Sequence, residues 1–590
     1  MEVTKYNLFS DYNNTQAAYP KGKLHELLEI AKNCYGDKIA IRDKHKEITY
    51  SDFYDSVNEL AESFPCVNQP MAIVAKKSIQ TVIRIFAILQ SGNYYIPIDP
   101  SYPQERTNYI LEKTKARALI DETKISWLHQ EEVEIPFKEK LKDGDSVAYV
   151  IFTSGSTGLP KGVVETHYQV MNTLYDLKDR LSLSEKDNFL CLASFNFDLS
   201  VFDLFETVLV GGTLYIVEDQ RDFKTIKSVL DTYPITIWNS VPNVMNHFLK
   251  ENELSQQVRT NLRACLLSGD YVSTELAKTV LATFPQSQTF SLGGATECSI
   301  WSILYLISPE TLTRYSYIPY GYPMKNQRIY VLDEQLKVCD LDEIGQIAIA
   351  GEGVALGYLG DEKKTGEAFV AHHDLGNIYL TGDLGRFVDK SHIKFVGRMD
   401  SRVKVNGYRV SLSEISTAFH SCFGLENRVF SLDQSESTQK IVVAYQSSEA
   451  LDESKLRKEL MNHLAVYELP HVYLNVASFP LTNNVKIDMG ELQKIAIEAL
   501  DQRRRNVINS AKDHSIEMTP FRKMLGQVLN VSQISPNDSL FDLGTDSIQL
   551  MKIKNWIEEN ENIEIELLDI YEHDVVHDLE AFIYRCEPVK

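Results

Sequence analysis

The segment 149–167 (YVIFTSGSTGLPKGVVETH) is the feature that most constrains the fold of this chain. A run of apolar, β-favouring residues leads directly into a turn rich in glycine, serine and threonine, and Lys161 follows Pro160 just after it. Glycines allow a backbone to turn its N–H groups inward, while hydroxyls and a lysine add donors and positive charge. The segment therefore predicts a cradle for a polyphosphate. It is not a Walker A loop, which needs Gly-Lys-Ser/Thr, and a flexible surface turn is the alternative interpretation.

Strand-like and helix-like runs alternate over the first four hundred residues. A helical stretch covers 79–91, and the runs expected to be strands lie at 38–42, 71–75, 94–100, 116–121, 147–153 and 213–217. Apolar strands interleaved with helices are typical of parallel sheets that are covered on both faces. We therefore expect an α/β body with mostly parallel sheets.

The pattern changes twice beyond residue 400. A strand at 440–446 and a helix near 454–465 predict a compact α+β unit of about a hundred residues. The polar, Arg-rich stretch 501–515 resembles a linker between domains. Thr519-Pro520 then supplies a cap and a first-turn proline for a helix that begins a small all-α bundle.

The composition is acidic, with 60 Lys+Arg against 82 Asp+Glu and a formal net charge of −22. This acidity disfavours nucleic acid and anionic membranes as partners, because both require basic patches. The sequence has no apolar run of about 18 residues, and its first residues lack the order of a signal peptide. The eight cysteines are scattered without a CxxC pair, which indicates free thiols. We therefore expect a cytoplasmic protein with no nucleic-acid or membrane partner.

The phosphate cradle and four later segments resemble those of the adenylate-forming enzymes, which include acyl-CoA synthetases, luciferases and the adenylation domains of nonribosomal peptide synthetases. The later segments follow in order as SLGGATECSIW (291–301), YLTGDLGRF (379–387), GRMDSRVKVNGYRV (397–410) and PLTNNVKID (480–488). The resemblance implies ATP and Mg²⁺ as ligands. It assigns nucleotide binding in the cradle to Thr153, Ser154, Gly155, Ser156, Thr157, Gly158 and Lys161.

The segment 291–301 carries over two more roles by resemblance. Thr296 lies near the α-phosphate, beside Gly294 in the same nucleotide-binding segment, and Glu297 holds Mg²⁺, an ion that prefers carboxylate oxygens. Taken alone, a Thr-Glu pair would be interpreted as a solvated loop. The family usually has an aromatic residue and a proline where this chain has Gly293 and Ala295, so its contact with adenine is not carried over.

The last three segments imply a ribose site, a hinge and a catalytic lysine. Asp383 accepts both ribose hydroxyls, for which one carboxylate is well matched. Asp400, with Arg398 beside it, matches a hinge about which a small domain takes two orientations. Lys486 matches the catalytic lysine, whose ammonium stabilises charge between the substrate carboxylate and the α-phosphate. Val485 stands where the family normally has glycine, and an exposed surface lysine is the alternative for Lys486.

The segment SFNFDLSVFDLFETVLVGG (194–212) resembles the amino-acid-binding segment of peptide synthetases. Asp198 lies where that family places the carboxylate that pairs with the substrate α-ammonium, and acyl-CoA synthetases lack this acid. A buried acid requires a cationic partner, so Asp198 implies a ligand with an amine. The alternative is that Asp198 only caps the helix that follows it.

The other positions that match the family's substrate pocket are Leu199, Phe202, Asn239, Leu266, Ser268, Leu292, Ile300 and Trp301. With Asp198 they form a small, mostly apolar lining that resembles the one in cysteine-activating domains. A thiol is weakly polar and fits among such residues without a full set of hydrogen bonds. We expect cysteine. Discrimination by a single methylene is worth only about 1–3 kcal/mol, so alanine, serine and small aliphatic amino acids stay open.

The segment SLFDLGTDSIQLMKI (539–553) resembles a peptidyl carrier domain, and Ser547 matches the serine that receives 4′-phosphopantetheine. The start of a helix suits a phosphodiester because the helix dipole is positive there. A serine that only caps a helix is the alternative. From Pro536 onward the chain has four basic and fourteen acidic residues, a surface that fits recognition by a phosphopantetheinyl transferase.

These features together predict four parts: a large adenylation subdomain (1–398), a small mobile subdomain (399–502), a linker (503–515) and a carrier domain (516–590). We expect the chain to activate an amino acid as aminoacyl-AMP and to load it onto its own carrier. A downstream condensation, cyclisation or other tailoring enzyme would then take the cargo. An acyl-CoA synthetase-like ligase and a catalytically decayed carrier or binding protein are the alternatives.

Overall fold

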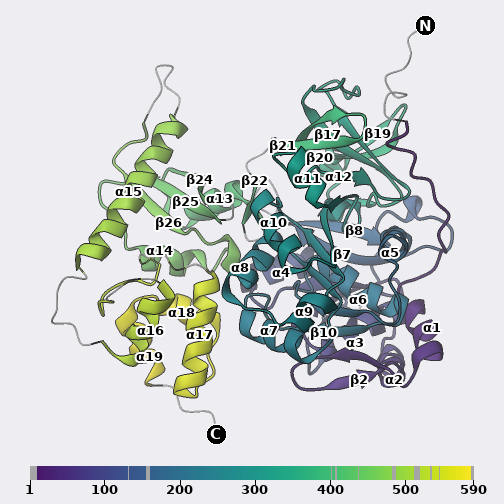
Figure 1. The fold of residues 1–590 in the computed structure, drawn as a ribbon, viewed down its shortest axis with the longest axis horizontal. Helices are drawn as coiled ribbons and strands as arrows, with labels where there is room; N and C mark the ends of the chain where they lie inside the picture. Colours follow the sequence, from purple (N-terminus) through teal and green to yellow (C-terminus); the bar gives the residue numbers. More distant parts are fainter. Residues whose placement is uncertain are drawn as a thin grey trace. The chain divides into compact units, whose positions relative to one another are not determined.

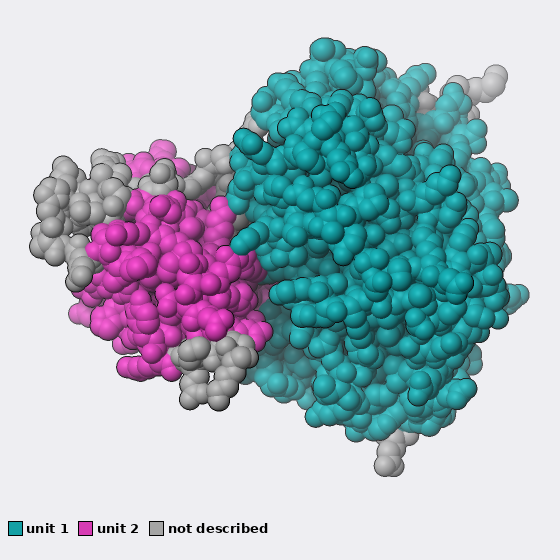
Figure 2. All heavy atoms as spheres, turned by 60° about the horizontal axis from the view of Figure 1, so that its bottom comes forward, with its two compact units in different colours: residues 1–411 teal, residues 412–590 magenta. Residues whose placement is uncertain are grey.

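The computed structural model describes most of the chain. The described residues are 10–129, 132–153, 160–399, 402–405, 408–435, 438–480, 487–510, 518–529, 531, 534–541, 543, 545 and 547–585. The chain divides into two compact units, residues 1–411 and residues 412–590, which Figure 2 colours separately.

The first unit contains a nine-stranded sheet in the order β15-β14-β13-β12-β11-β9-β10-β1-β2. Its strands are β1 (Ile39–Arg42), β2 (Glu47–Thr49), β9 (Asn188–Cys191), β10 (Thr213–Ile216), β11 (Ile237–Ser240), β12 (Ala264–Ser268), β13 (Gln288–Gly293), β14 (Ile303–Ile307) and β15 (Tyr322–Pro323). The six inner strands are parallel, and the strands at both edges are antiparallel. Strands β11 and β12 are buried at every position, as expected for a sheet covered on both faces.

A second sheet of the first unit has seven strands in the order β18-β8-β7-β4-β3-β5-β6. They are β3 (Pro70–Val74), β4 (Tyr94–Ile98), β5 (Ala118–Ile120), β6 (Ile125–Trp127), β7 (Val147–Thr153), β8 (Lys161–Thr166) and β18 (Gly357–Tyr358). Strands β7, β4, β3 and β5 are parallel. Strands β7 and β8 form an antiparallel hairpin that pairs Thr153 with Lys161, so both ends of the expected phosphate cradle are fixed.

Two apolar helices connect the two sheets. Helix α3 (Ile79–Gln90) packs on β3 and β4, and helix α6 (Leu199–Val210) packs on β9 and β10. Nearly every residue of both helices is buried, as expected for helices that are apolar all round. The rings of Phe86 and Phe205 lie 4.9 Å apart and join the two helices.

The other helices of the first unit are α1 (Glu26–Tyr35), α2 (Tyr50–Ala61), α4 (Gln104–Thr114), α5 (His167–Leu181), α7 (Phe223–Thr232), α8 (Pro242–Glu251), α9 (Gln256–Asn261), α10 (Thr274–Thr283), α11 (Pro309–Arg314) and α12 (Glu362–Ala368). The expected helix at 79–91 and all the strand-like runs correspond to elements of the structure.

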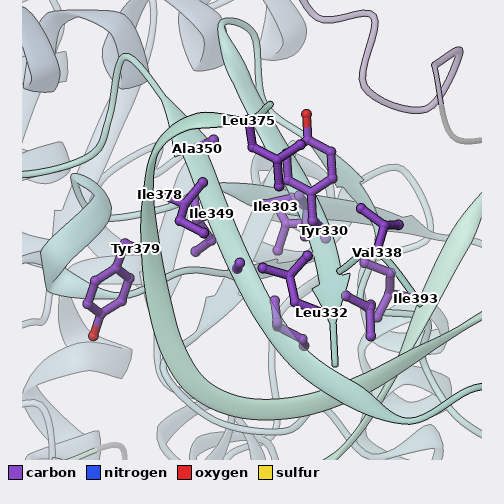
Figure 3. Close-up of a cluster of buried hydrophobic side chains, with 14 of the residues drawn as sticks. Ile303, Tyr330, Leu332, Val338, Ile349, Ala350, Leu375, Ile378, Tyr379 and Ile393 are labelled. Carbon is purple, nitrogen blue, oxygen red and sulfur yellow. The ribbon is translucent and has the colours of Figure 1, made fainter. Parts of the chain in front are cut away.

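A third sheet consists of β16 (Gln327–Leu332), β17 (Gly345–Gly351), β19 (Phe369–His372), β20 (Gly376–Asp389) and β21 (His392–Arg398). Its core includes Leu332, Ile349 and Ile378, which Figure 3 shows among the labelled residues of the cluster. Tyr379 points away from Ile378 in that view, because successive residues on a strand face opposite sides. This sheet carries the residue expected to bind ribose, Asp383.

The expectation of mostly parallel sheets needs a correction, because the sheets are mixed. Every strand pair of the third sheet is antiparallel. The connection between β20 and β21 is a tight turn, and a tight turn can join only antiparallel neighbours. The hairpin of β22 (Arg402–Val405) and β23 (Tyr408–Ser411) ends the first unit.

The second unit begins with an α/β part, residues 412–510, which we call the small subdomain. It has a three-stranded sheet in the order β24-β25-β26, formed by β24 (Asn427–Ser435), β25 (Thr438–Gln446) and β26 (Val472–Val476). Its helices are α13 (Leu412–Phe423), α14 (Glu453–Leu460) and α15 (Met489–Ser510). Helix α15 extends into the segment 503–515 that was expected to be a linker, and its residues there include good helix formers such as arginine.

A helical bundle follows, whose described helices are α16 (Pro520–Leu529), α17 (Ser547–Glu561), α18 (Leu567–Glu572) and α19 (Val576–Ile583), drawn in yellow in Figure 1. We call it the carrier bundle. Its helices enclose one apolar core that includes Phe521, Leu550, Ile557 and Leu579. The expected helix starts at Pro520 and near residue 547 agree with the structure.

Seven cysteines in the described part of the chain form no disulfide bond with one another, and four of them are buried. Among the described residues, no helix combines the length and the apolar character needed to cross a membrane.

Candidate active site

Asp198 directly precedes α6 but does not cap it. Its carboxylate is 3% exposed and makes no capping hydrogen bond to the helix. Instead, the Thr296 hydroxyl donates a hydrogen bond of 2.7 Å to Asp198 Oδ2. The structure therefore does not support the capping alternative. It brings together two residues that lie 98 positions apart and that were expected to contact the amino acid and the α-phosphate.

Glu297 follows Thr296 in the short 3₁₀ turn Thr296–Cys298, and its side chain is fully buried. The Tyr358 hydroxyl donates a hydrogen bond of 2.8 Å to Glu297 Oε1. The Lys161 ammonium lies 4.1 Å from the centre of the Tyr358 ring, within the range of a cation–π contact. Tyr358 therefore joins the end of the phosphate cradle to the carboxylate that was expected to hold Mg²⁺.

Glu165 is a third buried carboxylate, which the sequence interpretation missed. It lies on β8, and its Oε1 accepts a hydrogen bond of 3.1 Å from the Ser299 N–H. Burial raises its pKa well above the ordinary value, and the charges of Asp198 and Glu297 raise it further. An acid that directly follows two valines in a buried strand is the signal that could have identified this residue.

Glu165 therefore lies close enough to Asp198 and Glu297 to sense their charges, and all three carboxyl groups are buried. Removal of carboxylates from water is costly unless cations or hydrogen-bond donors compensate. An ammonium group and a divalent ion are both suitable compensating charges. Glu297 fits Mg²⁺ because it supplies a hard oxygen ligand beside the phosphate cradle.

The eight expected lining residues lie together in the first sheet and on the helix that covers it. Helix α6 contributes Leu199 and Phe202, β11 contributes Asn239, β12 contributes Leu266 and Ser268, β13 contributes Leu292, and the following turn contributes Ile300 and Trp301. All eight are buried. The strand residues lie at or near the carboxyl ends of parallel strands, where open α/β sheets bind ligands. The rings of Phe202 and Trp301 lie 5.2 Å apart.

The Asn239 amide has a defined orientation. Its Nδ2 donates to the Leu199 carbonyl at 3.2 Å and to Asp203 Oδ1 at 3.0 Å. A carbonyl only accepts, so the amide nitrogen must face this side. Oδ1 of Asn239 then has no hydrogen-bond partner in the described part of the chain, and neither do Ser268 Oγ and Trp301 Nε1. Buried polar atoms are normally satisfied, so these three are suited to bind a polar ligand.

Asp203 and Lys77 are further charged residues that the sequence interpretation missed. Both are buried, and Lys77 Nζ donates to the Cys191 carbonyl at 2.8 Å. Burial raises the pKa of Asp203 to about 8, although the hydrogen bond from Asn239 and the charge of Lys77 lower it. The sequence signal was an acid on the apolar helix α6, at a position that faces the sheet. Asp203 holds the Asn239 amide and is therefore a positioning residue.

The turn that carries Ile300 and Trp301 is strained and tightly packed. Ser299 and Ile300 have φ values of 59° and 71°, which are uncommon for residues other than glycine and most costly for a β-branched residue. A Cβ at Gly294 would lie 2.8 Å from the Ile300 carbonyl oxygen and 2.8 Å from Trp301 Cα. Glycine at 294 therefore allows the turn to approach β13.

Gly293, which stands where the family usually has an aromatic residue, lies against a tyrosine ring. A Cβ at Gly293 would lie 2.4 Å from Cε2 of Tyr320, so the Tyr320 ring occupies the space that a side chain at 293 would need. The Tyr320 N–H bonds the carbonyl of Ile393 on β21, and its ring lies 6.1 Å from that of Phe395. An aromatic ring from another segment thus lies beside Gly293.

Asp383 and Arg398 face each other across β20 and β21 and form an ion pair. The Asp383 N–H also bonds Thr381 Oγ1 at 3.0 Å. Both ionic side chains are less than 10% exposed. The guanidinium therefore holds the carboxylate that was expected to accept the ribose hydroxyls in a fixed position.

Several expected site residues lie outside the described residues. These are Ser154, Gly155, Ser156, Thr157 and Gly158 of the cradle, the hinge residue Asp400 and the catalytic Lys486. Thr153 closes β7, and its buried Oγ1 has no hydrogen-bond partner among the residues described here. Ser547 is the first residue of α17.

Residues 28–359 match the family of AMP-binding enzymes, and residues 520–583 match the phosphopantetheine attachment site. The first match covers more than half of the chain. The chain belongs to the AMP-binding enzymes. The expected class, an ATP-dependent adenylate-forming enzyme joined to a phosphopantetheine carrier, is confirmed by these two matches.

Known relatives and solved structures agree with this assignment. The chain is 32% identical to bacitracin synthase 1 of Bacillus licheniformis and 29% identical to tyrocidine synthase 3 of Brevibacillus parabrevis. The alignments cover 100% and 99% of this chain but only 11% and 9% of those proteins. Holo-PA1221, a nonribosomal peptide synthetase protein with adenylation and PCP domains, has the same fold, with a TM-score of 0.74, 20% identity and 99% of each chain covered. The expected α/β fold with a helical carrier is confirmed.

The close approach at Gly294 can be tested directly. Gly294→Ala should destabilise the first unit by about 1–3 kcal/mol, because the added methyl group would meet backbone atoms that cannot move aside. Gly366→Ala in α12 is the control, since nothing lies within 4 Å of its added Cβ. Thermal unfolding should show a lower melting temperature for Gly294→Ala and an equal or higher one for Gly366→Ala. Equal melting temperatures for the two variants would contradict the tight packing of this turn.

Proposed function

We propose that the chain activates an amino acid as its aminoacyl adenylate, with ATP, and loads it onto its own carrier bundle. The observation that carries this proposal is the buried carboxylate of Asp198, which does not cap α6 and is bonded to Thr296. A fatty acid has no positive charge to offer a buried carboxylate, whereas an amino acid brings an ammonium group. This contrast favours an amino acid over the substrate of an acyl-CoA synthetase-like ligase.

Asp198, Thr296 and Lys486 each have a separate role in the proposed formation of the adenylate. Asp198 binds the α-ammonium, which fixes the substrate carboxylate near Thr296. One carboxylate oxygen attacks the α-phosphorus of ATP, and pyrophosphate leaves. Thr296 and Lys486 are proposed to stabilise the negative charge that develops there, and positioning of this kind supplies much of the rate enhancement.

Three groups around the nucleotide complete the proposal. Glu297 would hold Mg²⁺, which neutralises phosphate charge when bound. Asp383 would accept the ribose hydroxyls, with Arg398 keeping it in place. The family usually has an aromatic residue at the position of Gly293. We propose that the Tyr320 ring contacts adenine instead, since this ring lies beside Gly293 and packs against the sheet that carries Asp383.

Cysteine is the amino acid that the lining supports best. Its S–H is a weak donor, and Asn239 Oδ1 is an acceptor held in position by Asp203. The remaining lining is mostly apolar, which suits a soft, polarisable sulfur. Aliphatic amino acids such as valine would leave Asn239 Oδ1 without a partner, and an unsatisfied buried acceptor costs about 1–3 kcal/mol.

A panel of amino acids in the ATP–pyrophosphate exchange assay tests this proposal. Exchange should be fastest with cysteine and slower by about tenfold or more with serine, alanine and valine. Asp198→Asn should lose most of the exchange. Asp222→Asn is a matched control, because Asp222 caps α7 and asparagine caps a helix equally well. Absence of exchange with every amino acid would overturn the proposed function, and exchange with leucine but not cysteine would overturn the substrate assignment.

The carrier role has its own test. Incubation with a phosphopantetheinyl transferase and coenzyme A should add one phosphopantetheine to the chain, measured as intact mass. Ser547→Ala should abolish this gain, whereas Ser535→Ala, at another serine of the same segment, should keep it. The arm, when attached, supplies the thiol that accepts the aminoacyl group. A mass gain that persists in Ser547→Ala would place the attachment site elsewhere.

A further inference from the structure

A buried ion pair joins the small subdomain to the carrier bundle within the second unit. Arg457 lies on α14, and its Nη1 donates to Asp574 Oδ2, on the segment between α18 and α19, at 2.9 Å. The two side chains are 2% and 5% exposed. Arginine and aspartate are rarely buried so completely unless they are paired.

Asp574 receives hydrogen bonds from both sides of this contact. Ser454 Oγ, on α14, donates to Asp574 Oδ1 at 2.5 Å, and Ser539 Oγ, in the carrier bundle, donates to Oδ2 at 3.0 Å. The backbone of Asp574 also belongs to the carrier bundle, because its carbonyl accepts the Leu540 N–H at 2.8 Å. Asp574 is thus built into the carrier bundle and presents its carboxylate to α14.

Aromatic rings enclose the Arg457 guanidinium. Its central carbon lies 3.9 Å from the centre of the Phe541 ring, in the carrier bundle, and 5.5 Å from that of Tyr473, on β26. Phe541 itself packs on Tyr571 of α18, with ring centres 5.0 Å apart. A planar cation between two rings, with a carboxylate at its edge, is typical of the few residues that dominate an interface.

Arg457 is one of three buried residues on α14, and it contacts Asp574 and Phe541 of the carrier bundle. Leu456 and Leu460 are the other buried residues of α14, whereas Lys458 and Glu459 are exposed. Separation of the carrier bundle would remove Phe541 and Asp574 from Arg457 and return both charges to water. Water then solvates both charges. Release of the carrier bundle therefore costs far less free energy than removal of one partner from an ion pair that stays buried in a core.

We propose that Arg457, Ser454, Asp574, Ser539 and Phe541 form a docking site that holds the carrier bundle on the small subdomain and releases it reversibly. We call this set the Arg457 docking site. The docking itself does not depend on the proposed function. Its role does: a carrier that receives cargo in one place and delivers it in another needs a resting place that it can leave.

The experiment compares Arg457→Met with the wild-type chain and with Lys458→Met, a control on the exposed side of the same helix. Nitrogen-15 relaxation of the carrier-bundle amides, in the full chain, measures how fast the bundle tumbles. In the wild type and in Lys458→Met the bundle should tumble with the body to which it is docked. In Arg457→Met its rotational correlation time should fall by about twofold or more. Pyrophosphate exchange should be unchanged in both variants.

Each result has one interpretation. An equal correlation time in all three proteins, whether slow or fast, would overturn the Arg457 docking site. Arg457→Met keeps Asp574 and its bonds within the carrier bundle, so unfolding of the bundle does not confuse the result, and dispersed amide signals verify that it is folded. If the wild type shows no pyrophosphate exchange while the relaxation difference is present, the proposed function fails and the docking site stands.

Discussion

The hydrogen bond between Thr296 and Asp198 is the contact on which the rest of the active site depends. It joins the turn after β13 to the residue that precedes α6, and so connects the end of a parallel strand to the helix that covers the sheet. Glu297 follows Thr296 directly and reaches Tyr358, which contacts Lys161 at the end of the phosphate cradle. One chain of contacts therefore runs from the proposed ammonium site to the proposed phosphate site.

The concentration of buried acids explains what this arrangement is for. Burial raises the pKa of Glu165 well above its ordinary value, and the charges of Asp198 and Glu297 raise it further because protein screens charge less than water. Each of the three acids accepts a hydrogen bond, and a cationic ligand would compensate them further. The ammonium group of an amino acid and a Mg²⁺ ion would each bring positive charge to these acids, which is why we favour amino acid activation.

Much of the fold and site followed from sequence because the signals were local. The apolar runs, the glycine-rich turn and the proline at the start of α16 each reflect the chemistry of a few neighbouring residues. The resemblance placed Asp198 and Thr296 in one site, although the sequence did not predict that they bond each other. Glu165, Asp203, Lys77 and Tyr320 were missed because each acts through a neighbour that is distant in sequence. The mixed character of the sheets was also missed, since strand pairing depends on tertiary contacts.

The central claim is that the Asp198 carboxylate recognises the substrate amine, and one binding measurement tests it most directly. Calorimetric titration would compare a non-hydrolysable analogue of cysteinyl adenylate with the same analogue lacking the α-amino group. A hydrogen bond between charged groups is worth about 1.5–3 kcal/mol, so loss of the amine should weaken binding by about tenfold or more. Equal affinity for the two compounds would contradict the assignment of Asp198.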